Sequence, residues 1–288
     1  MTQSSTVRTL LAASAATMAL AVSGTASGAD VAHAGPTVGP HAADPAVRAA
    51  EDGRARKVVE KRVIGRSVEG RKIVAYRKGN PSATRTVVVL GQMHGDERAG
   101  VQTANHLIKR VAVSRKADVW VIPTMNPDGY AHDTRRNARG VDLNRNWPMN
   151  WTRTGRGITY SGPRAASEPE TRAMMRFLRK VQPRFLSSIH QPYGEVGRYS
   201  DKPLGFQRRL ARGLSLPLRG ISVGPDEPAG DPDDSLQPGG HDNAPTLTGW
   251  YNAHYPGTAI TVEYTRNPTH RYRTVKAGNA ILRASRAR

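Results

Sequence analysis

The sequence of 288 residues contains no cysteine. Disulfide bonds are therefore excluded, and packing, with or without a bound metal, must hold the fold together. The same absence removes every thiolate metal ligand and every cysteine nucleophile. A zinc site in this chain would have to be built from histidine and carboxylate side chains.

Acidic residues are scarce relative to basic ones. The chain has 23 aspartate and glutamate residues against 43 lysine and arginine residues, which gives a formal net charge of +20. Such a field attracts anionic polymers, including nucleic acids and acidic wall polymers, and it says little about the fold. Because no nucleic-acid-binding module is recognisable, we expect most of this charge to lie on solvated surface, and we expect no nucleic-acid partner.

Long hydrophobic runs are also rare, and the one near the N-terminus is shorter than the roughly 20 residues of a membrane span. In residues 1–34, Arg8 precedes an apolar segment at 9–23, and small residues at 27–29 or 32–34 offer a cleavage site. This order predicts an export signal, and hence a secreted or cell-wall protein without a membrane span. A disordered, alanine-rich leader is the alternative.

The remaining chain divides into a linker and one folded domain. Residues 35–53 show little periodicity and indicate a flexible linker, whereas strand-like and helix-like patterns alternate over residues 54–288. Strands are predicted at 58–66, 72–78, 87–90, 118–124, 183–191 and 258–264, and helices at 99–111, 167–181, 204–218 and 272–287. This order predicts an α/β fold with a mixed, mostly parallel central sheet flanked by helices.

Local signals refine this prediction. The first two strands are expected to form a hairpin, and Ser167 with Glu170 predicts a capping box at the start of the second helix. Residues 125–130 indicate a turn, and the arginine-rich loop at 134–148 is predicted to be too polar for the core. Residues 224–245 are predicted to form a long acidic surface loop.

The stretch TVVVLGQMHGDERAG at residues 86–100 places titratable side chains directly after a buried strand. Its apolar run ends at Gly91, and His94 and Glu97 follow before a helical pattern begins. Open α/β sheets bind ligands at the edge formed by the carboxyl ends of their strands. Because imidazole and carboxylate both suit zinc, this pair is a candidate metal site.

Other strand ends carry polar groups to the same expected edge. His190 ends the strand at 183–191, the arginine-rich loop follows the strand at 118–124, and Glu263 interrupts the apolar strand at 258–264. A buried carboxylate such as Glu263 is costly without a partner. A cation, or a water held by a metal, is the natural candidate for that partner.

Together these motifs resemble the zinc metallocarboxypeptidases. The matching segments are HGDE at 94–97, NPDGY at 126–130, RRNARGVDLNRNWP at 135–148, SIH at 188–190 and TVEYT at 261–265, with GRSVEGRKI at 65–73 matching the opening hairpin. They occur in the family's order and span most of the chain after the linker. The resemblance implies that residues 54–288 form a zinc carboxypeptidase-like catalytic domain of the phosphorylase/hydrolase-like type.

Carried over to this chain, the resemblance implies one zinc ion, held by His94, Glu97 and His190 with a fourth position left for water. Zinc lowers the pKa of such a water, and Glu263 matches the general base that takes its proton.

The resemblance also implies a peptide substrate with a free carboxylate. Arg135 matches the arginine that stabilises the oxyanion formed during hydrolysis. Asn144 and Arg145 match the pair that binds the terminal carboxylate, a task that suits the forked guanidinium group.

Two positions depart from the digestive carboxypeptidases. Counting back from Glu263 reaches His241 where that branch has a tyrosine lid, and Tyr251 and Tyr255 are alternative candidates for the lid. Thr248 aligns roughly with the residue that selects the side chain of the substrate. Its small neutral hydroxyl argues against a pocket dedicated to a basic side chain.

The arginine-rich loop and the SEPET helix start are more similar to bacterial murein peptide amidases, which cleave between γ-D-glutamate and diaminopimelate in wall peptides. The leading hypothesis is a secreted, monomeric zinc metallocarboxypeptidase that hydrolyses a C-terminal peptide or amide bond, with anionic cell-wall polymers as further partners. Two alternatives remain. One is a zinc-dependent N-acyl amino acid deacylase of the same superfamily, and the other is a basic polyanion-binding protein without catalysis.

Overall fold

The structure, a computed structural model, describes residues 54–220 and 245–288. The predicted export signal, the predicted linker and His241 lie outside these residues, as does all but the last residue of the predicted loop at 224–245. Among the helices of the described residues, none combines the length and the apolar character needed to cross a bilayer.

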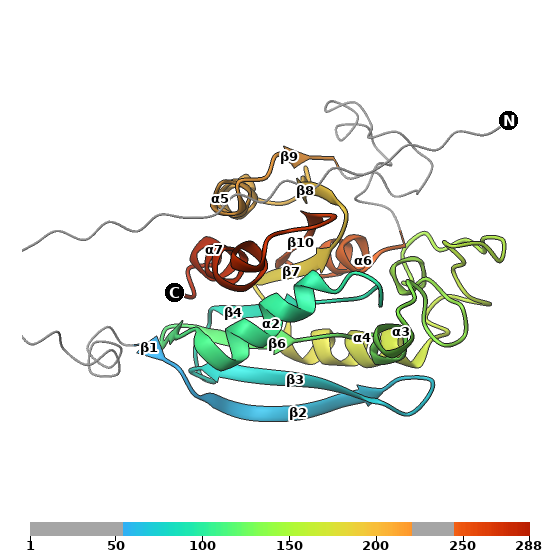
Figure 1. Cartoon of the computed structure of the whole chain (residues 1–288), viewed down its shortest axis with the longest axis horizontal. Coiled ribbons are helices and arrows are strands. Elements are labelled where there is room, and N and C mark those ends of the chain that lie inside the picture. Colours follow the sequence, from blue (N-terminus) through green and yellow to red (C-terminus); the bar gives the residue numbers. More distant parts are fainter. Residues whose placement is uncertain (1–53, 221–244) are drawn as a thin grey trace, which may run out of the picture. The chain divides into compact units, whose positions relative to one another are not determined.

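Within the described residues, one sheet has the strand order β2-β3-β6-β4-β7-β10-β8-β9 (Figure 1). Its strands are β2 (Val58–Arg66), β3 (Lys72–Gly79), β4 (Thr86–Leu90), β6 (Asp118–Ile122), β7 (Phe185–His190), β8 (Tyr193–Gly197), β9 (Leu218–Arg219) and β10 (Thr258–Thr265). A separate pair joins β1 (Arg54–Ala55) to β5 (Val113–Ser114). The middle strands β6, β4, β7 and β10 are parallel, and β3 and β8 pair antiparallel to their two ends. The predicted mixed sheet is therefore confirmed.

The four parallel strands bring their carboxyl ends to one edge, where α/β sheets bind ligands. In the register of β7 with β10, Glu263 lies directly beside His190. In the register of β4 with β7, Leu90 lies beside Ser188. The segment after β4 and the last residues of β7 therefore meet at the edge that also holds Glu263.

Helices cover both faces of the sheet (Figure 1). Val87 and Val89 of β4 face a core shared with α2, α5 and α7, whereas Val88 and Leu90 face a core shared with α4 and α6. This alternation is the period of two expected for a strand buried on both faces. The helices are α2 (Ala99–Arg110), α4 (Pro169–Val181), α5 (Leu204–Leu214), α6 (Leu247–His254) and α7 (Ala277–Ala284), the last preceded by the π-helical η4 (Tyr272–Lys276).

The predicted capping box at the start of α4 is wrong. The helix begins at Pro169, and Glu168 is its N-cap without a side-chain hydrogen bond. Ser167 donates instead to the carboxylate of Glu168, and Glu170 accepts a hydrogen bond from the backbone N–H of Val68. The carboxylate expected to cap its own helix is therefore used to hold the turn of the β2–β3 hairpin.

Other element boundaries also differ from the predictions. The helix α5 ends at Leu214 rather than residue 218, because Ser215 adopts the left-handed conformation with φ 56°. The predicted helix at 272–287 divides into η4 and α7. The sequence patterns did not predict β8 or α6. Residues 247–252 of α6 are all buried, so the helix lacks an amphipathic period.

Residues 141–147 of the arginine-rich loop at 134–148 are mostly buried, which contradicts the prediction that the loop is too polar for the core. Leu143 and Trp147 are fully buried. The side chain of Asn146, also fully buried, donates to Ser161 O and accepts a hydrogen bond from Glu168 N. Buried polar groups are tolerated when each finds a hydrogen-bond partner, and Asn146 finds its partners outside the loop, in the segment at 161–168.

The predicted turn at 125–130 contains the start of a short helix, α3 (Pro127–His132). Asn126 caps it, because its Oδ1 accepts a hydrogen bond from Gly129 N at 2.9 Å.

Lys78 is buried in β3, with 1% of its surface exposed. Its Nζ donates to Leu107 O at 2.8 Å, to Ile108 O at 3.0 Å and to Val111 O at 2.6 Å. These carbonyls belong to the C-terminal turn of α2 and lack partners within the helix. The lysine thus fastens the end of α2, the helix that follows His94 and Glu97, to the sheet.

We expect Lys78→Met to lower the free energy of unfolding by roughly 2–4 kcal/mol, because three buried carbonyls lose a charged donor while the apolar stem is kept. Lys72→Met is the matched control: Lys72 lies on the same strand but is exposed, and its replacement should change stability by less than about 0.5 kcal/mol. Urea unfolding followed by circular dichroism measures both. Equal effects of the two substitutions would contradict the role of Lys78.

Candidate metal centre

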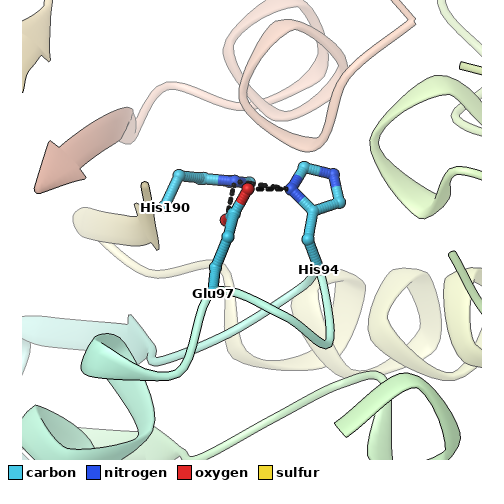
Figure 2. Close-up of side chains that lie close together, drawn as sticks. All are labelled: His94, Glu97 and His190. Carbon is cyan, nitrogen blue, oxygen red and sulfur yellow. Dashed lines mark hydrogen bonds and ion pairs between the residues drawn. The ribbon is translucent and has the colours of Figure 1, made fainter. Parts of the chain in front are cut away.

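Three side chains predicted as metal ligands converge on one point, as Figure 2 shows. His94 and Glu97 come from the segment between β4 and α2, and His190 is the last residue of β7. All three are buried, and one ligand atom from each lies within 4.8 Å of the others. The Nδ1 atoms of His94 and His190 lie 2.7 Å and 3.1 Å from the two carboxylate oxygens of Glu97.

The spacing of the two imidazole nitrogens fits a tetrahedral zinc ion. The two Nδ1 atoms are 3.3 Å apart. Two nitrogens bound to one zinc ion at about 2.05 Å and at the tetrahedral angle are separated by about 3.3 Å. Two imidazoles and one carboxylate leave a fourth position open, which is the composition of a catalytic rather than a structural zinc site.

The electrostatics of the site also favour a cation. Burial opposes the charge of Glu97, but the adjacent His94 and His190 outweigh it and lower its pKa to about 2. Burial likewise opposes a charge on His94, yet Glu97 and Asp142 raise its pKa to about 9. Without a metal, the carboxylates of Glu97 and Asp142 therefore keep His94 protonated. A bound cation would supply the positive charge in place of that proton.

The far side of each imidazole ring is held by a second residue. His94 Nε2 lies 3.1 Å from Asp142 Oδ1, and His190 Nε2 lies 3.0 Å from Ser188 Oγ. Such contacts fix the ring orientation and leave Nδ1 free for a metal. Although burial opposes the charge of Asp142, His94 and Arg135 hold its pKa well below its usual range.

Sequence analysis missed Asp142 and Ser188. Asp142 carried a usable signal, because it stands between the apolar residues Val141 and Leu143. The same pattern had singled out Glu263. Ser188 carried none, since a serine in a strand is not unusual.

Two glycines support the segment that carries His94. A Cβ on Gly95 would lie 1.9 Å from the carbonyl carbon of Gly129, so only glycine allows the segment to approach α3 this closely. Gln92 Nε2 donates to Gly95 O at 2.9 Å and holds the same turn. The NPDGY motif at residues 126–130 thus acts as a backbone support for the metal ligands.

Glu263 is buried beside the three ligands, next to His190 in the sheet register. Its Oε2 has no hydrogen-bond partner among residues 54–220 and 245–288. Burial, together with the nearby charge of Glu97, raises the pKa of Glu263 to about 8. A buried carboxylate with one free oxygen beside a metal centre is suited to exchange protons near neutral pH.

Arg135 lies at the same site. Its Nη2 donates to Asp142 Oδ2 at 3.0 Å and its Nη1 donates to Glu97 Oε1 at 3.3 Å. About a quarter of its side chain, 24%, remains exposed. The guanidinium is therefore held in place by Asp142 while one face stays open to a ligand.

Asn144 and Arg145 follow in the short 3-10 helix η1 (Leu143–Arg145). Asn144 Oδ1 accepts a hydrogen bond from Leu247 N, and Arg145 Nη1 donates to Asn144 O. Among the described residues, no carboxylate forms an ion pair with Arg145. Burial lowers the pKa of Arg145, as expected for a cation that lacks a counterion.

Thr248 lies at the start of α6 in a buried group of hydroxyls. Its Oγ1 is 2.8 Å from Tyr199 Oη and 3.1 Å from Thr261 Oγ1. Thr261 precedes Glu263 by two residues on β10 and so faces the same side of the sheet. The predicted selector position is thus neutral, polar and connected to the strand of Glu263.

Two of the three candidate lid residues, Tyr251 and Tyr255, lie within the described residues. Tyr251 is fully buried and its hydroxyl donates to Pro183 O, so the prediction that it replaces the lid is wrong. Tyr255 stacks on Tyr251 with ring centroids 4.9 Å apart. His241 lies outside the described residues. Tyr193 on β8 was not singled out from the sequence. It is 54% exposed and pairs with Thr265, two residues after Glu263 on β10.

Comparison with known proteins agrees with the geometry of the site. The sequence model of the zinc carboxypeptidase family (peptidase M14) matches residues 51–200. Murein peptide amidase A of Escherichia coli (strain K12) is 32% identical over 179 residues, which cover 57% of this chain and 71% of that protein. Carboxypeptidase A6 of Homo sapiens is 30% identical over 148 residues, which cover 41% of this chain and 34% of that protein.

Solved structures show the same fold. Murein-tripeptide amidase MpaA from Escherichia coli O157 aligns with a TM-score of 0.60 at 23% identity, over 81% of this chain and 94% of that one. Carboxypeptidase A from Helicoverpa armigera aligns with a TM-score of 0.62 at 18% identity, over 80% of this chain and 69% of that one. The family match ends before β10, so the fold rather than that match brings Glu263 to the site.

We expect Asp142→Asn to weaken zinc binding by roughly 10–100-fold, because His94 loses the anion that orients its ring. Asp133→Asn is the control, since Asp133 is exposed and pairs only with Arg98 among the described residues. Competition with a chromogenic chelator measures both affinities, and circular dichroism verifies folding. Unchanged zinc affinity in folded Asp142→Asn protein would contradict the assignment.

We expect Glu263→Gln to stabilise the metal-free protein at alkaline pH. The folded-state pKa of about 8 exceeds the ordinary value of 4.5, so the stability that this group contributes is fully present below pH 4.5 and is lost as pH rises through about 8. The variant should therefore gain up to about 5 kcal/mol over the unmodified chain between about pH 5 and about pH 9, since each pH unit between these two pKa values contributes about 1.4 kcal/mol. Urea unfolding in chelator measures this difference, and parallel pH profiles would refute it.

Proposed function

The chain belongs to the zinc carboxypeptidase family, and from that membership we propose that it is a secreted, zinc-dependent peptidase acting on cell-wall peptides. The bond cleaved is the peptide or amide bond next to the residue that carries the free terminal carboxylate. The observation that carries the proposal is the position of Glu263, a buried carboxylate with an unpartnered oxygen, beside His94, Glu97 and His190.

His94, Glu97 and His190 would hold the metal through two Nδ1 atoms and one carboxylate. A zinc ion bound there would supply a Lewis acid that polarises the carbonyl of the substrate and lowers the pKa of a water. Glu263 accepts the proton of the attacking water at Oε2 and returns it to the leaving amine. Burial raises the pKa of Glu263 in the metal-free site, and a bound cation would lower it again, which suits a group that must accept and then release a proton.

Arg135 and the pair Asn144–Arg145 bind the charged parts of the substrate. Arg135, fixed by Asp142, donates to the carbonyl oxygen as negative charge develops on it. Arg145 lacks a counterion among the described residues, and its guanidinium fork fits a terminal carboxylate. Because this pocket binds a carboxylate, cleavage is restricted to the end of a chain.

Two observations support a wall peptide as substrate. The alignment with murein peptide amidase A of Escherichia coli covers 71% of that protein, and its name identifies a murein peptide as its substrate. The net charge of +20 also favours adsorption to an anionic wall, where exported protein would meet such peptides. Recovery of the protein from the culture fluid or the wall fraction, rather than from the cytosol, checks the export part of the proposal.

We expect the purified chain to hydrolyse L-Ala-γ-D-Glu-diaminopimelate, and to lose this activity when a chelator removes the metal. Glu263→Gln should lower kcat by roughly 10²–10⁴-fold while the protein still binds zinc, because only proton transfer is lost. Asp133→Asn serves as the matched control and should retain full activity.

The reaction is followed by release of diaminopimelate, with ordinary C-terminal peptides and acyl-glutamate assayed in parallel. Equal turnover of ordinary peptides would remove the wall-peptide part of the proposal. Cleavage of acyl-glutamate alone would identify a deacylase. If no substrate is cleaved by the zinc-loaded protein, the proposed function fails.

A further inference from the structure

A strongly basic cavity of about 460 Å³ lies between α5 and the C-terminal helical segment η4–α7. We call it the basic groove. It is lined by Arg209, Arg212 and Gly213 of α5, and by Arg271, Val275, Lys276, Asn279, Ala280, Arg283 and Ala284. None of these residues contributes to the metal centre, and the volume is within the range of ligand pockets.

Helical spacing explains why the cations share one surface. Lys276, Ala280 and Arg283 recur at intervals of four and three residues, so they fall on one side of the C-terminal helical segment. On α5, Arg209 and Arg212 are three residues apart and face the same way. Each helix thus lines the groove with a row of cations, and the two rows face each other.

Small residues allow the two helices to approach at the floor of the groove. A Cβ on Gly213 would lie 3.1 Å from the Cβ of Ala280. Further along, Arg209 Nε donates to Ala284 O at 2.9 Å, which ties α5 to the end of α7. The contacts 213–280 and 209–284 run in opposite directions, so the helices are antiparallel and the groove follows their shared length.

The positive charge of the groove is not neutralised within the described residues. None of its four arginines or Lys276 forms an ion pair there. Within the part of the chain that the structure describes, Lys276 Nζ donates to Ser215 Oγ at 2.9 Å and lies over the ring of Tyr272. Burial lowers the pKa of Arg209, and the neighbouring Arg286 and Arg212 lower it further. Like charges held together in this way repel, and an anionic ligand would relieve the repulsion.

We propose that the basic groove binds a linear polyol-phosphate polymer, with its phosphate groups on the arginines. Arginine forks bind phosphate oxygens, and donors that converge from two helices suit a tetrahedral anion better than a planar carboxylate. The lining contains no aromatic ring, so the groove lacks the platform on which nucleic-acid bases stack. The site is separate from the metal centre and would keep the enzyme on an anionic matrix.

The test compares two pairs of substitutions with equal charge change. Arg212→Gln/Arg283→Gln removes one exposed cation from each wall of the groove. Arg176→Gln/Arg179→Gln removes two exposed cations spaced three residues apart on α4, which covers the other face of the sheet. Fluorescence anisotropy with labelled oligo(glycerol phosphate) measures binding to the full chain.

We expect the groove pair to weaken binding at least tenfold and the α4 pair to change it less than twofold. Equal losses in the two pairs would overturn the proposal in favour of diffuse attraction to a basic surface. Oligoglutamate or RNA of matched charge that binds the unmodified chain as tightly would overturn the assignment to polyol phosphate.

Two further readouts keep this result separate from folding and catalysis. The ligand-free melting temperature of the groove pair should be unchanged or higher, because repulsion is reduced. Hydrolysis of a soluble tripeptide should be unchanged as well. Loss of tripeptide hydrolysis together with polymer binding would show that the groove is not a separate site and would overturn the proposal.

Discussion

The arrangement of the site depends on the hydrogen bonds that the buried carboxylate of Asp142 accepts. One oxygen accepts hydrogen bonds from the backbone of Asn144 and from the ring of His94, and the other accepts from Arg135. A single anion therefore positions His94, Arg135 and the turn that carries Asn144 and Arg145. Because it is fully buried, its charge persists only while these partners stay in place.

The candidate metal centre also shows how a chain without disulfides can keep several charges inside. Glu97, Asp142 and Glu263 are all buried within one site, and their neighbours compensate them unequally. Glu97 and Asp142 stay ionised beside imidazole and guanidinium groups, whereas Glu263 is driven towards the protonated form. A divalent cation bound here would balance this charge and would thereby stabilise the folded protein.

Buried polar loops limit what the sequence patterns could predict. The arginine-rich loop was expected at the surface because its composition is polar, yet Asn146 and its neighbours are satisfied by hydrogen bonds and lie inside. The same reason accounts for Glu170, whose carboxylate bonds to the distant hairpin instead of capping its own helix. Composition records how polar a segment is, whereas burial depends on whether partners far along the chain satisfy it.

By itself, the sequence determined the α/β class, the central strands and the residues at the ends of those strands, because hydrophobic periodicity and short motifs are local properties. It also identified His94, Glu97, His190 and Glu263 as the groups to bring together. Only the tertiary structure decided that they meet, since strand order and register join positions far apart in the chain. The structure alone also revealed Asp142 as the shared partner and the groove between α5 and α7, because both arise from contacts that no local pattern encodes.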